Sequence, residues 1–175
     1  MSSGRILFPF PPAQPFRWSE KGFIVQRLVH TGDYPYSYRA TTLLGELLSL
    51  ERFGSRRSTP SLDASDHEIE TADFAPKPDR DYRLVDDEDV LTLARRTAAC
   101  FPALPLLGID ILRDTKGRLY VIEINAGGNT WHFSSKVWEE HRRADPQYYV
   151  DMRQQFGAFD IAARRLCEVV QAQAG

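Results

Sequence analysis

Apolar and polar residues alternate along several short segments of the chain, which is the pattern of half-buried β-strands. Three such segments follow one another near residues 23–30, 36–43 and 47–52. The short sequence Leu44-Gly45-Glu46 is predicted to turn the second segment into the third. Strands with connections this short pair most simply with their sequence neighbours, so an antiparallel meander is predicted.

Two other segments have apolar residues at the helical period. Residues 85–101 begin with an acidic turn, in which Asp86 or Asp87 is the expected N-cap, and they end before Pro102. A last helix is predicted over roughly residues 156–171. The faces expected to point to the core are Val90, Leu93, Ala94, Thr97, Ala98 and Phe101 in the first helix, and Phe159, Ala163, Leu166 and Val170 in the last.

The remaining segments are polar or rich in proline. Residues 53–83 contain many Ser, Asp and Pro residues, and a disordered surface loop is the favoured interpretation. Residues 1–21 include a proline-rich stretch that cannot form a helix. The predicted organisation is therefore a proline-rich segment, 1–21, and one domain, 22–175. Its predicted class is α+β, with an antiparallel sheet packed against helices.

The segment 107–129 reads as two apolar strands joined by a tight turn at Lys116-Gly117. It holds three polar residues that strand interiors rarely contain, Asp110, Glu123 and Asn125. Their alternation with apolar neighbours is the pattern of a strand with one polar face. An ordinary hairpin whose carboxylates face solvent is one interpretation, with Leu119, Val121, Glu123 and Asn125 sharing that face.

The tight turn also predicts how the two strands align. Asp110 then lies opposite Glu123, and Gly108 lies opposite Asn125, so that a residue without a side chain leaves room beside the amide. Like charges placed opposite one another repel. A divalent cation such as Mg²⁺, which binds carboxylate oxygens, would turn this repulsion into binding.

Asp110, Glu123 and Asn125, in this order and spacing, resemble the metal-binding hairpin of the ATP-grasp superfamily. Members of this superfamily are ATP-dependent ligases that mostly join a carboxylate to an amine or thiol. The resemblance implies that these three residues bind Mg²⁺, that ATP is the second cofactor, and that the substrates are a small carboxylate and an amine. It also implies that the fold is the C-terminal lobe of the ATP-grasp module.

Residues 22–39 resemble the hinge strand of the same superfamily and the strand after it. The resemblance implies that adenine is bound by Gln26, Arg27 and Val29, ribose by Asp33, and the phosphates or the acyl intermediate by Arg39. Relatives often carry Glu where Gln26 stands, and an amide also exchanges hydrogen bonds with the adenine amine. A plain amphipathic hairpin is the alternative interpretation.

A glycine-rich loop follows Asn125, and paired glycines let the backbone approach a ligand closely. In relatives this loop helps to bind phosphate or the acceptor, which makes Asn129 a candidate ligand, together with Thr130, Trp131 and His132. The alternative is a glycine turn that ends the strand, with Trp131 and Phe133 as core anchors.

The resemblance covers about residues 22–133, which is the C-terminal half of the module. The chain has four lysines, and none stands where the phosphate-holding lysines of the N-terminal half are expected. The implied reaction forms an acylphosphate from a carboxylate and ATP, and an amine then displaces phosphate. Two alternatives stay open: a truncated, catalytically inactive nucleotide-binding remnant, and a half-enzyme completed by a partner polypeptide that carries the N-terminal lobe.

Composition narrows the remaining function classes. The chain is 42% hydrophobic with a net charge of −2, and no basic run interleaves with aromatic residues, so no nucleic-acid partner is expected. No apolar run approaches the roughly 20 residues that span a bilayer, so no membrane partner is expected.

Cys100 and Cys167 fall on predicted helices and read as small buried hydrophobes in a reducing, cytoplasmic setting. The histidines lack zinc spacing, and neither a P-loop nor a Rossmann motif occurs.

Overall fold

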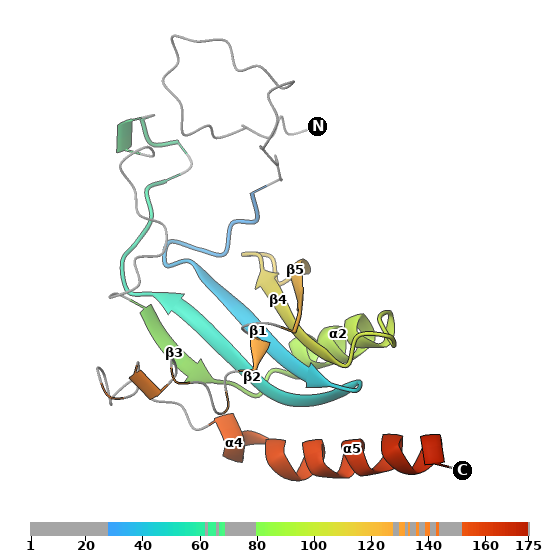
Figure 1. Cartoon of the computed structure of the whole chain (residues 1–175). Helices are drawn as coiled ribbons and strands as arrows, with labels where there is room; N and C mark the ends of the chain where they lie inside the picture. Colours follow the sequence, from blue (N-terminus) through green and yellow to red (C-terminus); the bar gives the residue numbers. More distant parts are fainter. Residues whose placement is uncertain are drawn as a thin grey trace, which may run out of the picture.

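The computed structural model describes residues 28–61, 63–65, 67–68, 80–127, 130–131, 133, 136, 139–140, 143 and 152–174. Within these residues, one antiparallel sheet has the strand order β3-β2-β1-β4-β5. Helices pack on both of its faces (Figure 1). The predicted α+β class is therefore confirmed. The strands are β1 Tyr36–Leu43, β2 Glu46–Ser55, β3 Arg80–Leu84, β4 Leu106–Arg113 and β5 Leu119–Ala126, and the helices are α2 Glu88–Ala99, α4 Met152–Gln155 and α5 Ala158–Ala174.

The central strand is β1, which pairs with β2 along one edge and with β4 along the other. For the described residues 28–30 the predicted pairing with β1 is wrong, because β2 and β4 occupy the two edges of β1. Residues 28–30 have no regular structure, and residues 22–27 lie outside the described part of the chain. The predicted turn between β1 and β2 is confirmed: Leu44 and Gly45 have φ angles of 50° and 85°, as a two-residue hairpin loop requires.

The polar segment 53–83 contains more regular structure than the sequence predicts. Its first residues belong to β2, which extends to Ser55, and its last residues belong to β3. β3 pairs antiparallel with residues 51–55 of β2. Across this strand pair, the rings of Phe53 and Tyr82 meet edge to face, with their centroids 5.0 Å apart. A cross-strand aromatic pair of this kind stabilises a sheet edge.

One face of the sheet packs against α2. The helix begins at the N-cap Asp87, whose carboxylate accepts a hydrogen bond from the backbone N–H of Val90. The same carboxylate binds Arg113 of β4 at 2.6 Å, which fixes the start of the helix to the sheet. The predicted helix is thus confirmed, but its buried face includes Leu91, and Phe101 is 38% exposed.

The opposite face of the sheet packs against α4 and α5. A second core cluster here joins Leu43 and Leu48 to Met152, Ala158 and Ala162. The predicted core face of the last helix is wrong, because Phe159, Leu166 and Val170 are exposed while the small residues Ala158 and Ala162 are buried. Cys100 and Cys167 are exposed as well, contrary to the prediction. No helix among the described residues is long and apolar enough to cross a membrane.

Candidate functional site

The β4–β5 hairpin has the predicted register at its polar residues. Asp110 lies opposite Glu123, and Gly108 lies opposite Asn125. The predicted two-residue turn is nevertheless too short, because β4 ends at Arg113 and β5 begins at Leu119. A β-bulge offsets this one-residue error: Ile111 pairs with Val121, so Ile122 is an extra residue in β5.

The bulge decides which face of the sheet receives the carboxylate. Side chains alternate along a regular strand, so the ordinary-hairpin interpretation places Leu119, Val121 and Glu123 on one face. The structure separates them. Leu119, Val121 and Ile124 pack against the core cluster between α2 and the sheet. Glu123 and Asn125 therefore lie on the opposite face of the sheet. Without the bulge, regular alternation of side chains along β5 would point the Glu123 carboxylate into the core.

Two rows of polar residues therefore cross the sheet on the face opposite α2. Residues paired across neighbouring strands have Cβ atoms about 5 Å apart, so the side chains of each row are neighbours, except at Gly108, which has no side chain. We call these eight positions the polar patch. The first row is Glu51, Arg39, Asp110 and Glu123, and the second row is Ser49, Thr41, Gly108 and Asn125, from β2 through β1 and β4 to β5.

Arg39 and Asp110 form a bidentate ion pair at the centre of the first row. The guanidinium Nε and Nη2 donate to the two Asp110 carboxylate oxygens at 2.7 and 2.6 Å. Hydrogen bonding to Asp110 raises the pKa of Arg39 above its usual value. The expected repulsion between Asp110 and Glu123 is therefore offset by Arg39, and not only by a cation as the sequence suggested.

The space beside Asn125 is filled by Thr130. A Cβ added at Gly108 would lie 3.0 Å from the Thr130 methyl carbon, so a glycine is needed for this approach. The Thr130 hydroxyl donates to the Asn125 carbonyl at 3.4 Å. The room that the sequence predicted beside the Asn125 amide thus holds a buried threonine. The amide itself donates weakly to Asp110, at 3.5 Å.

Three buried residues of the polar patch were missed by the sequence analysis: Thr41, Ser49 and Glu51. In the described part of the chain, the Thr41 and Ser49 hydroxyls and the Glu51 Oε1 have no hydrogen-bond partner. Burial, reinforced by the charge of Asp110 and opposed by that of Arg39, raises the pKa of Glu51 to about 8. Ser49 stands between Leu48 and Leu50 as Asp110 stands between two isoleucines, but Glu51 is followed by the charged Arg52, so its burial has no local signal.

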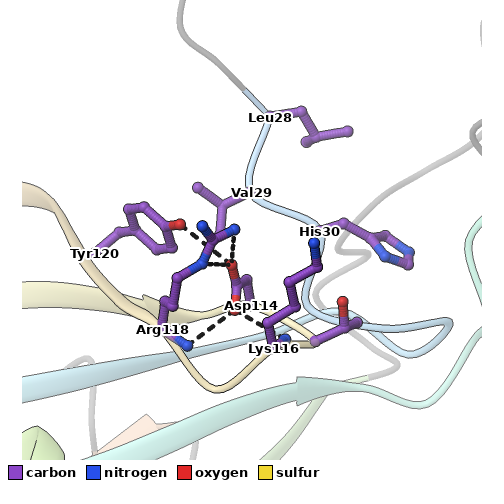
Figure 2. Close-up of a pocket in the computed structure, with 8 residues that line it drawn as sticks. Leu28, Val29, His30, Asp114, Lys116, Arg118 and Tyr120 are labelled. Carbon is purple, nitrogen blue, oxygen red and sulfur yellow. Dashed lines mark hydrogen bonds and ion pairs between the residues drawn. The ribbon is translucent and has the colours of Figure 1, made fainter. Parts of the chain in front are cut away.

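A separate pocket lies at the tip of the β4–β5 hairpin and has a volume of about 150 Å³ (Figure 2). Val29 lines it, with Leu28 and His30 beside it. The carbonyl of His30 accepts a hydrogen bond from the backbone N–H of Thr115 at 3.1 Å, which joins this segment to the hairpin. The other lining residues are Asp114, Thr115, Lys116, Arg118 and Tyr120, and none of the eight residues of the polar patch is among them.

Asp114 organises the wall of this pocket. Its carboxylate accepts hydrogen bonds from the Arg118 side chain at 2.8 Å and from the Tyr120 hydroxyl at 3.1 Å (Figure 2). Desolvation pushes the pKa of Asp114 upward, but these bonds and those from the Arg118 and Lys116 backbone lower it to about 2. This carboxylate therefore stays ionised and holds the turn together through its hydrogen bonds. Asp114 is the one acidic residue among the described residues that line the pocket, and it is already bonded.

The other predicted ligands are distributed differently. Asp33 is described, and its carbonyl accepts hydrogen bonds from the backbone N–H and the hydroxyl of Thr59, at 2.7 and 3.3 Å. The ring of Trp131 lies 4.8 Å from that of Phe133, which is buried, as the core-anchor interpretation of this loop expects. Gln26, Arg27, Asn129 and His132 lie outside the described residues.

The residues of the polar patch suit Mg²⁺ as a partial ligand set. Each carboxylate oxygen has two lone pairs, so Asp110 keeps acceptor capacity beyond its bonds to Arg39. Further oxygen atoms come from Glu123, which lies opposite Asp110, and from Asn125, two residues further along β5. Among the described residues, no group of three or more His, Cys, Asp or Glu is placed to hold a metal ion. A cation here would therefore complete its shell with oxygens of a bound phosphate or water.

No protein-family model and no curated protein matches the chain. Among solved structures, an ATP-grasp ligase, PsnB, complexed with minimal precursor is 17% identical, with a TM-score of 0.41 over 62% of this chain and 30% of that chain. The macrocyclase MdnC from Microcystis aeruginosa MRC, bound with precursor peptide MdnA, is 13% identical, with a TM-score of 0.38 over 64% of this chain and 31% of that chain. The chain thus spans about a third of the length of either protein.

Proposed function

We propose that this chain is an ATP-grasp-type protein that binds Mg²⁺ and ATP and belongs to a carboxylate–amine ligase acting through an acylphosphate. The observation that carries the proposal is the cross-strand register of Asp110 and Glu123, with Arg39 bound to Asp110. The sequence motif first suggested this pair. Asp110 lies opposite Glu123, as the motif needs, although the turn is longer than predicted and β5 contains a bulge. Carboxylates in this position are suited to a hard divalent cation.

Each predicted ligand has a role in this proposal. Asp110, Glu123 and Asn125 would hold Mg²⁺, which when bound neutralises charge on phosphate oxygens. Arg39, already beside Asp110, would stabilise charge that develops on the transferred phosphoryl group. The proposed nucleotide contacts are Gln26, Arg27 and Val29 for adenine, Asp33 for ribose and Asn129 for phosphate.

The proposed reaction has two steps. The substrate carboxylate attacks the γ-phosphorus while the bond to the β–γ bridging oxygen breaks, which gives an acylphosphate and ADP. The amine then attacks the acyl carbon, phosphate leaves, and the amine loses a proton. The chain's own residues contribute mainly by positioning the reactants and by balancing charge.

A second candidate function is a half-enzyme that works with a separate polypeptide supplying the N-terminal lobe. The observation that favours it is the exposure of Leu28 and Tyr34, which are 53% and 59% exposed on the segment that leads into β1. Large apolar side chains near a proposed nucleotide pocket suit a docking surface. A catalytically inactive remnant would bind nucleotide without turnover.

Calorimetry with a non-hydrolysable ATP analogue tests the proposal. We expect weak binding that requires Mg²⁺, and we expect Glu123→Gln to weaken Mg²⁺-dependent binding by about tenfold or more, which is about 1.4 kcal/mol. Glu46→Gln, a matched change at the start of β2, should leave binding unchanged. Absence of heat at millimolar nucleotide in a folded sample would refute nucleotide binding. Equal binding by the Glu123 variant would refute the metal site.

A further inference from the structure

The single guanidinium of the polar patch lies between two carboxylates. Arg39 is paired across the sheet with Asp110 on β4 and with Glu51 on β2, so both carboxylates are immediate neighbours. The guanidinium binds only one of them, because both of its hydrogen bonds go to the oxygens of Asp110. Glu51, on the other side, is 3% exposed, and its Oε1 has no hydrogen-bond partner in the described residues.

The two carboxyl groups beside Arg39 differ in how well their hydrogen bonding is satisfied. A buried Oε1 without a hydrogen-bond partner is unfavourable for Glu51, whereas Asp110, which is satisfied, is the carboxylate that the proposed metal site needs. A cation that approaches Asp110 and Glu123 brings its positive charge close to Arg39, and like charges repel. If the guanidinium turns toward Glu51 and that acid releases its proton, the ion pair with Asp110 on β4 is replaced by one with Glu51 on β2.

We infer that Glu51 is the alternative partner of Arg39, which receives the guanidinium when a divalent cation binds Asp110 and Glu123, and that Glu51 thereby sets the affinity of the metal site. Glu51 is a positioning residue in this role, since it acts through Arg39 and does not touch the cation. The inference rests on the proposed function, because it requires a cation at Asp110 and Glu123. It adds a residue that the sequence motif does not include.

The first experiment measures metal binding without nucleotide or turnover. The full chain is titrated with Mn²⁺, and free Mn²⁺ is followed by electron paramagnetic resonance. Glu51→Gln keeps the size of the side chain but cannot ionise to pair with the guanidinium, and we expect it to weaken Mn²⁺ binding by about tenfold or more. Glu46→Gln, on the same strand and away from Arg39, is the matched control and should bind as the unmodified chain does.

The second experiment observes Arg39 directly, and its main readout is taken on the unmodified chain, so it does not depend on whether the Glu51 variant folds. The ¹⁵N signal of Arg39 Nε is assigned in the unmodified chain by its loss in Arg39→Lys. We expect saturating Mg²⁺ to shift this signal, because Nε exchanges the carboxylate of Asp110 for that of Glu51. In Glu51→Gln the shifted signal should be absent at the same Mg²⁺ occupancy.

The outcomes separate the two proposals. Mn²⁺ binding that is lost in Glu123→Gln but unchanged or tighter in Glu51→Gln would overturn the role of Glu51 and leave the metal site standing. An Arg39 signal that does not move at saturating Mg²⁺ would also overturn it. If the unmodified chain binds neither Mn²⁺ nor Mg²⁺, the proposed function fails and the inference fails with it.

Discussion

Arg39 governs the charge balance of the polar patch. In the first row, one guanidinium stands among three acidic residues, Glu51, Asp110 and Glu123. The electrostatic influence of all three raises the pKa of Arg39, with hydrogen bonding to Asp110 as the largest cause. Both hydrogen bonds of the Arg39 guanidinium go to Asp110, so the guanidinium does not bind Glu123 directly. A row with surplus acidic groups attracts a cation even while one ion pair is formed.

The first prediction concerns the ion pair itself. Asp110→Asn removes the charged partner of a guanidinium that is only 30% exposed, so we expect the free energy of unfolding to fall by about 1–2 kcal/mol in the absence of metal. Urea denaturation at neutral pH measures this change. Glu123→Gln should be neutral or slightly stabilising under the same conditions, because it removes a like charge opposite Asp110. A stabilised Asp110→Asn variant would contradict the prediction.

The second prediction concerns the pH dependence of stability. The pKa of Glu51 is raised from 4.5 to about 8 in the folded chain, so between these values the folded state holds a proton that the unfolded state has released. Stability contributed by the protonated acid is therefore lost as pH rises from about 5 to 8, by at most roughly 1.4 kcal/mol per pH unit.

The measurement is urea denaturation of the unmodified chain and of Glu51→Gln across this pH range. The difference between the two proteins isolates the residue, because the other titrating groups are shared. Glu51→Gln should lose less stability than the unmodified chain as pH rises. Parallel curves for the two proteins would show that Glu51 is ionised in the folded state.

Individual residues were predictable from sequence where their partners are near in sequence. The pair of Asp110 and Glu123 follows from one hairpin, and it was predicted. The contact of Arg39 with Asp110 joins residues 71 positions apart and depends on β1 lying between β2 and β4. Burial of Glu51 depends on the same strand order, so no local pattern could reveal it.

Among the strands, the bulge at Ile122 is the feature that shapes the site. It turns Glu123 and Asn125 to the face of Asp110, while Leu119 and Val121 stay in the core. Alternation of apolar and polar residues did not reveal it, because Ile122 is apolar but 40% exposed. Bulges often re-aim side chains near functional sites in this way.

The third prediction follows from the geometry of this bulge. Deletion of Ile122 removes the extra residue, and it leaves Val121 opposite Ile111 and Glu123 opposite Asp110. We therefore expect the deletion variant to fold with a change in stability within about 1 kcal/mol. Deletion of Ile124 is the control, since it moves Asn125 to the core face and should unfold the hairpin. Thermal unfolding followed by circular dichroism distinguishes them, and an unfolded Ile122 deletion would show that the bulge itself is required.

The helices show the same division between local and distant information. α2 was predicted because one apolar face, an N-cap and a closing proline agree within one segment. α5 has apolar residues on two sides, Ala158 and Ala162 on one, Leu166 and Val170 on another. The sequence favoured the larger residues, but the small alanines let the helix approach Leu43 and Leu48 closely. The choice of face thus depends on the shape of the sheet beneath.

For the molecule as a whole, Gln155 connects the helical layer of α4 and α5 to the sheet. Its side-chain amide binds the backbone of Leu50 as a neighbouring strand would: Oε1 accepts from the Leu50 N–H at 2.9 Å, and Nε2 donates to the Leu50 carbonyl at 3.3 Å. Nε2 also donates to the Val85 carbonyl at 2.7 Å, just beyond the end of β3. Leu50 is the neighbour of Glu51 in β2, so this contact fixes the backbone next to the polar patch.

The last prediction tests this connection. Gln155→Ala leaves the Leu50 N–H and the Val85 carbonyl without these partners, so we expect a loss of about 2 kcal/mol in the free energy of unfolding. Hydrogen exchange should accelerate in β2 around Leu50 and in α5, while the β4–β5 hairpin keeps its protection because Gln155 does not contact it directly. Gln154→Ala, at an exposed neighbouring position, is the matched control and should change neither stability nor exchange. Uniform acceleration across all strands would mean that Gln155 supports the whole fold equally, and unchanged exchange near Leu50 would mean that the amide is not the link between the helical layer and the sheet.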